Sequence, residues 1–449
     1  MLTYFMKSIY KFSFLIIVAL IVSLRSGYAQ QSLSLTEAIT LARANNRELK
    51  ASELEIEKAN QQKVIARSAF LPTVNLNAQA NHYFKLQPFF GFGENGEQDK
   101  IPYGRFGGED QFAANITAVQ PLFSPWAAPW LHRARLQQQQ SMAAAQAKQA
   151  EIVSQIRNEY LLLLVLNERI ELKQESIIRN KRVLQDSRSL FIQGKGLRVD
   201  TLRAYTAVKN LEPDMIKLSY ASQTGKLRLR TLMGLDSLPD FNLTDSLQMT
   251  AVGDVVSEDE VYEQIRATNP ELKLLTIQAE VDRQQERVSA SYYLPVISLI
   301  GQYQVQTQTN NLEYGNAYYP NSSFVGLQVS VPLFTGLSTR AKVRQASLTR
   351  NQSTLLMQQR QQQLRADVHQ ALANSKEASL RLESTAVVQE TAQLSFTIIQ
   401  YRYKSGLSSR LELTDAELAL STAQSNYLEA VYDYLSAQIA LNKLKGVVE

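Results

Sequence analysis

The sequence contains no cysteine and only three histidines among its 449 residues. The lack of cysteine excludes disulfide bridges, thiolate zinc sites, iron–sulfur clusters and cysteine nucleophiles. His82, His132 and His369 are widely separated in the chain, and a three-histidine metal site would need all of them to meet. No nucleophile motif, phosphate-binding loop or metal-ligand spacing replaces them. We therefore expect no enzyme active site, no metal and no cofactor.

The chain also carries little excess charge of one sign. Its formal net charge is +5, and residues 1–29 supply three of these charges with no acid. The nearly neutral remainder offers no basic surface for nucleic acid. In the N-terminal segment, Lys7 and Lys11 precede an apolar run, Phe12–Leu24, and Ala29 ends a stretch with small residues. This pattern predicts a signal peptide over residues 1–29, rather than a membrane anchor, which needs about 20 apolar residues.

No later apolar run is long enough for a transmembrane helix, and the second half of the chain repeats the first. Three segments recur in the same order: Arg43–Leu76 as Arg266–Leu299, Pro-Leu-Phe 121–123 as 332–334, and Phe191–Gly234 as Tyr403–Gly446. A shared order over this length indicates a tandem duplication. We place the first repeat at 30–234, a non-periodic linker at 235–257 and the second repeat at 258–449.

Each repeat contains a segment in which the hydrophobic period changes from 3.6 to 2. Strand hairpins are predicted over 73–123 and 296–334, with strands of about 9–12 residues, the length that crosses a bilayer at a tilt. One face is apolar, as at Val74 and Leu76, and the other is neutral and polar, as at Asn75 and Asn77. The alternative is a soluble sheet packed on a helix layer.

Long helices follow the strands. Leu131–Gln193 and Leu337–Ser405 contain neither glycine nor proline, and helices of this length span roughly 95–105 Å. Each is expected to turn back, forming helical hairpins over 124–233 and 336–445. The returning segment Arg410–Lys445 has a heptad pattern typical of left-handed coiled packing. Its counterpart in the first repeat contains Pro213 and Gly225, where we expect a kink.

Two strand hairpins cannot close a barrel, and open strand edges in lipid would leave backbone groups unpaired. The chain should therefore oligomerise. Two copies would give an eight-stranded barrel filled by side chains, whereas three would give twelve strands and a water-filled lumen, which the polar face favours. The predicted fold class is mainly α with a transmembrane β part, a duplicated unit whose trimer forms a 12-stranded barrel continued by a long α-helical barrel. The loops Phe89–Asp110 and Gln308–Asn321 would face the cell exterior.

This duplicated order of helix, Leu-Pro, strand hairpin, Pro-Leu-Phe, long helix and glycine turn resembles the outer-membrane efflux protein family, also called TolC-like. The resemblance implies a homotrimer in the cell outer membrane with a periplasmic helical tunnel. It also implies the exit duct of a tripartite efflux pump or type I secretion system, with a periplasmic adaptor protein and an inner-membrane transporter as partners. The alternative function is a trimeric surface adhesin or stalk protein, although the strands of an adhesin would lie at the chain end. A periplasmic enzyme is the third possibility.

The resemblance also implies two sites at the helical turns. The adaptor-docking tips would be Gly194, Lys195, Gly196, Leu197, Gly406, Leu407 and Ser408, although a plain turn needs its glycine in any case. The periplasmic gate would use Asp200, Glu412, Phe191 and Tyr403, with Arg198 and Arg410 as pairing partners across neighbouring hairpins. The two acids each follow a turn glycine by six residues. Their alternative role is to complement the helix dipole, worth roughly 0.3–1 kcal/mol.

Overall fold

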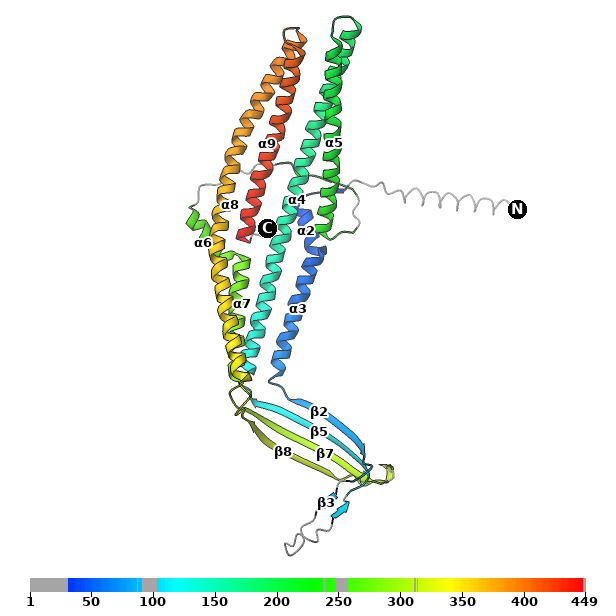
Figure 1. The fold of residues 1–449 in the computed structure, drawn as a ribbon, viewed down its shortest axis with the longest axis vertical. Helices are drawn as coiled ribbons and strands as arrows, with labels where there is room; N and C mark the ends of the chain where they lie inside the picture. Colours follow the sequence, from blue (N-terminus) through cyan, green and yellow to red (C-terminus); the bar gives the residue numbers. More distant parts are fainter. Residues whose placement is uncertain are drawn as a thin grey trace, which may run out of the picture. The chain divides into compact units, whose positions relative to one another are not determined.

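Figure 1 shows the computed structural model of the chain, which describes residues 31–86, 88–90, 103–105, 107–236, 240–247, 257–310, 312 and 314–446. Contacts divide the chain into two compact units, which we treat separately. The helical unit comprises the chain up to residue 53, residues 145–270 and the chain from residue 361 onward. The sheet unit comprises residues 54–144 and 271–360.

The two halves of the chain form the same series of elements. The first contains α2 (Leu35–Asn45), α3 (Arg47–Ser68), β2 (Thr73–His82), β5 (Asp110–Phe123), α4 (Ala127–Ile192) and α5 (Arg198–Met233). The second contains α6 (Glu258–Thr268), α7 (Pro270–Ser291), β7 (Val296–Thr309), β8 (Asn321–Ser330), α8 (Ser338–Lys404) and α9 (Arg410–Lys445). Short elements are β1 (Gln31–Leu33), β3 (Pro88–Phe90), β4 (Tyr103–Arg105), β6 (Phe241–Leu243) and the 3₁₀ turn η2 (Tyr314–Asn316).

Within the helical unit, a buried asparagine interrupts the helix in each repeat. Asn46 separates α2 from α3 and is 4% exposed. Its side-chain Oδ1 accepts hydrogen bonds from the backbone N–H groups of Glu48 (2.8 Å) and Leu49 (3.1 Å), which caps the start of α3. Its Nδ2 donates to the carbonyl of Leu232, at the end of α5, at 2.7 Å. The first turn of α3 is thereby tied to the last turn of α5.

The second repeat reproduces this junction. Asn269 is 4% exposed, and its Nδ2 donates to the carbonyl of Leu444, in the last turn of α9, at 3.1 Å. Gly234 and Gly446 end the returning helices in left-handed conformations, with φ of 71° and 70°. A Cβ on Gly234 would lie 2.4 Å from the carbonyl oxygen of Asn45, so only glycine fits there. The shorter helices of each repeat thus meet end to end at these junctions.

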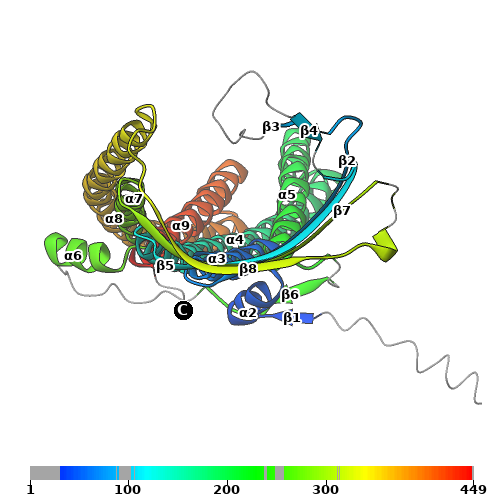
Figure 2. The ribbon, with the colours of Figure 1, turned by 90° about the horizontal axis from the view of Figure 1, so that it is seen from below.

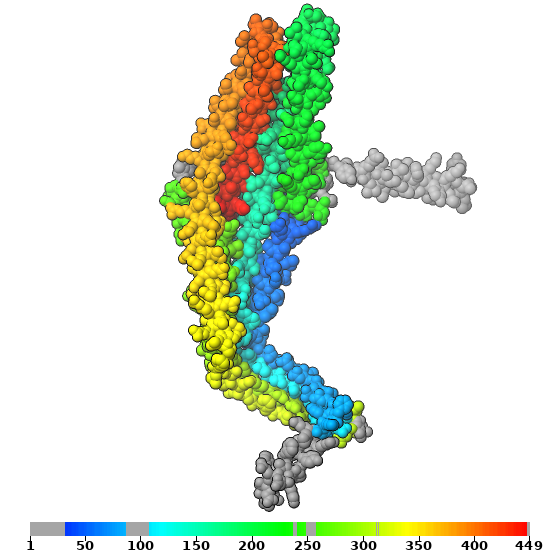
Figure 3. All heavy atoms as spheres, viewed as in Figure 1, coloured from blue at the N-terminus to red at the C-terminus, as the bar shows by residue number. Residues whose placement is uncertain are grey.

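The returning helices pack against the long helices along one face, as Figure 3 shows for the orange and red pair, α8 and α9. In α9 the predicted heptad residues Leu413, Ala416, Leu420 and Ala423 are buried. A second buried stripe lies one residue further on, and it comprises Glu417, Gln424, Leu428 and Val431. The helix therefore has neighbours on two sides. α5 continues as one helix through Pro213.

The sheet unit holds one four-stranded antiparallel sheet in the order β2-β5-β7-β8. Figure 2 shows it as a curved layer. The strand hairpins of the two repeats join through β5 and β7, whose register runs from Asp110 opposite Thr309 to Phe123 opposite Ile297. β2 and β8 are the two ends of the sheet, and nearly all of their residues are exposed.

The register assigns the apolar and polar side chains to opposite faces. Leu76, Ile116 and Tyr303 lie in one row across three strands, on the apolar face. The neighbouring row contains Asn77, Asn115, Gln304 and Ser322. Amide side chains on this polar face bond to one another, as from Gln304 Nε2 to Gln306 Oε1 at 3.1 Å. The predicted alternation of faces is confirmed.

Two features of the fold differ from the expectations. β8 ends at Ser330 and does not reach Phe334, because Ser330 pairs with Val296, the residue at which the partner strand β7 begins. The linker, expected to be irregular, contains β6, which pairs in parallel with β1. Phe241 of β6 is fully buried in the same core as Leu33 and Tyr160, and the Tyr160 hydroxyl donates to the carbonyl of Leu33 at 2.9 Å.

None of the helices in the described ranges is sufficiently long and apolar to cross a lipid bilayer. The predicted signal peptide, residues 1–29, lies outside the described residues. So do most of the loop Phe89–Asp110 and parts of the linker 235–257 and of the loop Gln308–Asn321.

The buried asparagines predict a stability effect. Asn46→Ala removes a helix cap and leaves the Leu232 carbonyl without its donor, so it should lower the free energy of unfolding by about 1–3 kcal/mol. Asn269→Ala should behave alike. Asn45→Ala is the matched control, because its side chain makes no hydrogen bond in the described structure. Chemical unfolding followed by circular dichroism measures the three variants. Equal stability of Asn46→Ala and Asn45→Ala would show that the junction contributes nothing.

Candidate functional site

The two helical turns of the helical unit have the same backbone geometry. After α4, the N–H of Gly194 donates to the carbonyl of Phe191 and the N–H of Lys195 to that of Leu190, at 3.0 and 2.9 Å. After α8, Gly406 and Leu407 donate in the same pattern to Tyr403 and Arg402, at 3.0 and 2.8 Å. This is the Schellman motif, which requires a left-handed residue at the helix end. Gly194 and Gly406 have φ of 69° and 73°.

The turns differ in how the next helix begins. Ser409 caps α9 by accepting a hydrogen bond from the backbone N–H of Glu412 at 3.2 Å. In α5 the capping position is Leu197, which has no side-chain acceptor, and the first turn contains Asp200. Gly196 also has a local role, because a Cβ there would lie 3.0 Å from the Cβ of Leu190. Both predicted acids thus lie in a first helical turn, where a negative charge is favourable.

Glu412 is exposed and strongly hydrogen-bonded to its own turn. The hydroxyl of Ser408 donates to its carboxylate. This bond, assisted by Ser409 and by the charge of Arg402, lowers the pKa of Glu412 from the ordinary carboxyl value. The side chain is therefore charged at neutral pH and keeps its charge in mildly acidic solution.

The aromatic residues before the turns have different surroundings. Phe191 is 45% exposed. Tyr403 packs against the apolar cluster of Phe396, Leu413, Ala416 and Leu420, which Val183 of α4 also contacts. The apolar cluster beside the second turn therefore contacts the first repeat through Val183 of α4. Across the described ranges, no ion pair joins Arg198 or Arg410 to Asp200 or Glu412 within this single chain.

A cavity of about 170 Å³ lies between α4, α8 and α9, next to the second turn. Tyr403 and Arg410, two of the predicted gate residues, line it. α4 contributes Arg179 and Arg182, and α9 contributes Glu417. The structure therefore places Tyr403 and Arg410, which belong to the predicted gate in the second repeat, at the same cavity as Arg179 and Arg182 of the first repeat. The sequence analysis did not predict these two arginines as site residues.

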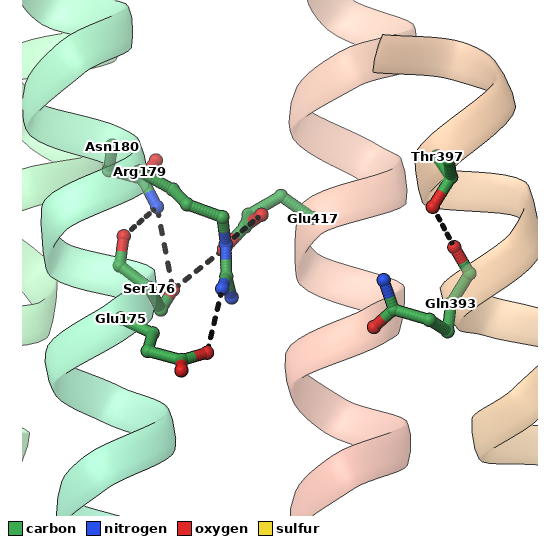
Figure 4. Close-up of polar contacts among 7 residues, drawn as sticks. All are labelled: Glu175, Ser176, Arg179, Asn180, Gln393, Thr397 and Glu417. Atoms are coloured by element: carbon green, nitrogen blue, oxygen red, sulfur yellow. Dashed lines mark hydrogen bonds and ion pairs between the residues drawn. The ribbon is translucent and has the colours of Figure 1, made fainter.

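Glu417 is the centre of the polar contacts beside this cavity. Figure 4 shows Arg179 extending from α4 to Glu417 on the neighbouring helix. Arg179 Nε lies 3.1 Å from both carboxylate oxygens, and Ser176 Oγ donates to Oε1 at 2.8 Å. The side chains of Arg179 and Glu417 are only 22% and 12% exposed. This pair joins the helical hairpins of the two repeats.

Sequence reasoning missed this ion pair, although a signal was present. Glu417 directly follows Ala416 of the heptad seam, so it begins the second buried stripe of α9. A charged residue beside a heptad position points to a partner on another helix. That this partner is Arg179 depends on how α4 packs against α9, and the spacing of residues in the sequence does not predict it.

The duplicated helical hairpins, the shared antiparallel sheet and the paired glycine turns define a class of tandem-repeat channel proteins. The chain matches the family described as outer membrane efflux protein over residues 38–235 and 261–447. The chain belongs to this family, so its predicted function as an outer-membrane channel for efflux or secretion is confirmed. The predicted outer-membrane location is confirmed with it, and so is the predicted duplicated fold, mainly α with a β part.

Individual relatives are distant but matched over most of their length. The chain is 22% identical to the alkaline protease secretion protein AprF of Pseudomonas aeruginosa, over 93% of this chain and 85% of AprF. It is also 22% identical to the outer membrane protein TolC of Vibrio cholerae, over 92% of this chain and 91% of TolC. The solved structure of the outer membrane protein VceC of Vibrio cholerae matches the fold with a TM-score of 0.72. The match has 17% sequence identity and covers 92% of this chain and 96% of VceC.

The buried ion pair predicts a characteristic set of stabilities. Glu417→Ala removes the carboxylate that Arg179 and Ser176 contact and leaves Arg179 only the carboxylate of Glu175, 3.3 Å from its Nη1. It should destabilise the protein by about 1–3 kcal/mol. Replacing both residues by leucine should restore most of this loss, because no buried charge is then unpaired. Glu390→Ala, an exposed acid on α8, is the control and should change stability by no more than about 0.5 kcal/mol. Urea unfolding of the four proteins measures the set. A Glu417→Ala variant as stable as the control would contradict this role.

Proposed function

We propose that three copies of this chain close their sheets into one twelve-stranded channel wall in the outer membrane. The proposal is carried by the two edges of the sheet, β2 and β8, whose outer sides pair with no further strand in the part of the chain that the structure describes. In lipid, each unpaired backbone group costs several kcal/mol, so neither edge can remain open. β2 and β8 run in opposite directions, because three successive antiparallel pairings separate them. β8 of one copy can therefore pair antiparallel with β2 of the next.

The polar face of the sheet supports three copies. Two copies give eight strands, and the interior of such a barrel is just wide enough for side chains. Three give twelve strands and room for water. The amide-rich row with Asn77, Asn115 and Gln304 would line this lumen, while Val74, Leu76 and Val325 would face lipid. These three apolar residues are 66%, 70% and 76% exposed in the single chain.

We infer that the helices continue the ring as a periplasmic tunnel. The chain would then be the exit duct of a tripartite efflux pump or type I secretion system. Its partners would be a periplasmic adaptor protein and an inner-membrane transporter, and the duct itself would catalyse no reaction. The repeats 30–234 and 258–449 would each supply one helical hairpin per copy, so that the trimer presents six turns. A surface adhesin would conduct no ions, and measurement of conductance in planar bilayers separates the two functions.

We propose that the turns carry the gate. Asp200 and Glu412 occupy first helical turns beside equivalent glycine turns, and Glu412 is exposed and charged. Three-fold symmetry would convert each acid into a ring, which is the geometry of a cation-attracting constriction. Phe191 and Tyr403 would narrow it, and Arg198 and Arg410 would pair across neighbouring hairpins. Weak contacts of this kind can hold a closed state when symmetry repeats them.

The gate predicts a change in conduction. Asp200→Ala combined with Tyr403→Phe should raise single-channel conductance and weaken cation preference, because the charge of the acidic ring and the polar hydroxyl of Tyr403 are lost. Thermal stability should change little. Glu390→Ala combined with Tyr401→Phe is the matched control, since it removes the same groups from α8. If conductance and ion selectivity both keep their wild-type values in the first variant, the acids act as helix caps alone.

We further propose that the turns dock the adaptor through the segments 194–197 and 406–408. Lys195 and Leu407 are exposed at equivalent positions, and Leu407 is 70% exposed. Lys195→Trp and Leu407→Trp should abolish efflux in cells that depend on this chain, while the yield of assembled protein stays normal. Leu380→Trp, at an exposed site on α8, is the control. Normal efflux with both turn variants would exclude docking at these turns.

A further inference from the structure

The four helices that adjoin the sheet carry only positive charge where they meet it. Within the sheet unit, α3 and α7 end beside the strands, and α4 and α8 begin there (Figure 1). We define the basic band as residues 63–72, 124–135, 287–295 and 331–344. The band contains neither aspartate nor glutamate. Its eight lysines and arginines are Lys63, Arg67, Arg133, Arg135, Arg287, Arg340, Lys342 and Arg344.

Most of this charge is exposed and lacks a counterion. The exposed members that form no ion pair in the part of the chain that the structure describes are Arg67, Arg135, Arg340, Lys342 and Arg344. The nearest carboxylate in the sequence, Glu286, directly precedes the band. It is held by Arg350, outside the band, at 2.8 Å. The positive charge of the band is therefore not neutralised within the chain.

Assembly of the proposed trimer does not supply the missing carboxylates. Rotation about an axis perpendicular to the membrane keeps every residue at its own depth. Neighbouring copies therefore bring the same acid-free segments to the level of the band. The positive charge is multiplied around the ring, and it needs an anionic partner from outside the protein.

The band is continuous with an apolar surface that suits the edge of a bilayer. The connections between the helices and the strands expose Phe70, Leu71, Leu122, Phe123, Tyr292, Tyr293, Leu294, Leu333 and Phe334. Aromatic side chains favour the boundary between acyl chains and headgroups. Basic residues directly beyond such a boundary attract anionic headgroups. The order of apolar strands, exposed aromatic residues and basic helix ends thus follows the layers of a membrane with an anionic surface.

Between α3 and α4 the band contains an open groove of about 720 Å³. Lys63, Arg67 and Arg135 line it, and Leu131 and Met142 contribute apolar walls. Arg67 and Arg135 are exposed, so their guanidinium groups are accessible to a ligand. Arginine binds phosphate oxygens through paired hydrogen bonds. The groove therefore offers a phosphate-binding end beside apolar surface, which matches a phospholipid headgroup.

We propose that the basic band binds anionic phospholipids of the periplasmic leaflet, with their phosphate groups at the α3–α4 groove and at the first turns of α8. The inference rests on the proposed function, because it requires the sheet to lie in lipid. Bound headgroups fix the depth at which the sheet enters the membrane, and they give the channel a preference for negatively charged lipid.

The two tryptophans of the chain report on this band. Trp126 and Trp130 both lie in it, at the start of α4, and both are partly exposed. The full-length protein is reconstituted in phosphatidylcholine bilayers in which brominated phosphatidylglycerol or brominated phosphatidylcholine replaces a minor fraction of the lipid. Bromine quenches tryptophan fluorescence at short range, so the loss of fluorescence reports the lipid beside the band.

At low salt we expect phosphatidylglycerol to associate about five-fold more strongly than phosphatidylcholine. The preference should disappear at about 1 M salt, where charges are screened within about 3 Å. Arg67→Gln combined with Arg135→Gln should reduce it to less than about two-fold. Arg188→Gln combined with Lys376→Gln removes the same charge from exposed positions of the helical unit, and it should keep the wild-type preference.

Circular dichroism and mass check that the band variant is folded and assembled; if it is not, Arg67→Gln alone replaces it, with a smaller reduction expected. Equal quenching by both lipids in a conducting channel overturns this proposal alone and leaves the band to an acidic protein partner. So does a conducting channel that neither lipid quenches, or a band variant that keeps the wild-type preference. A protein that neither conducts nor is quenched overturns the proposed function as well.

Discussion

The unpaired backbone of β2 and β8 is the constraint on which the rest of the molecule depends. A four-stranded sheet with one apolar and one amide-rich face is incomplete by itself, since its two edges and its apolar face all need cover. Lipid can cover the apolar face, but it cannot satisfy the edges. Association with further copies of the chain satisfies both edges with the pairing already used between β5 and β7. The tandem duplication therefore already joins two strand hairpins edge to edge within one chain, and oligomerisation repeats this antiparallel pairing between chains.

Duplication also explains why the helical unit contains two equivalent junctions and two equivalent turns. Asn46 and Asn269 make the same contact with the last turn of a returning helix, and Gly194 and Gly406 make the same turn. The repeats differ where function is proposed. Ser409 caps α9, while Leu197 leaves α5 without a side-chain cap. Tyr403 packs against the apolar cluster around Phe396 and Leu413, while Phe191 is exposed. The second turn is thus more closely packed than the first, and the cavity lined by Tyr403 and Arg410 lies beside it.

Most of the architecture could be predicted from the sequence, because its signals are periodic and repeated. The absence of glycine and proline marked α4 and α8, the heptads marked the buried face of α9, and alternation marked the sheet faces. β1 and β6 could not be predicted, since a three-residue strand has no period and their pairing joins distant segments. The Glu417–Arg179 pair and the cavity depend on the packing of helices from different repeats. The roles of Asp200 and Glu412 came from resemblance and stay a prediction, because a single chain does not contain the ring they would form.

The mass of the detergent-extracted protein tests the central claim most directly. Light scattering with the detergent contribution subtracted should give three times the mass of one chain. This result is expected because closure between copies satisfies β2 and β8, and because only three copies leave the amide-rich face room for water. A monomeric, water-soluble species with full helical content would contradict the account, since its sheet edges would then be stable without partners.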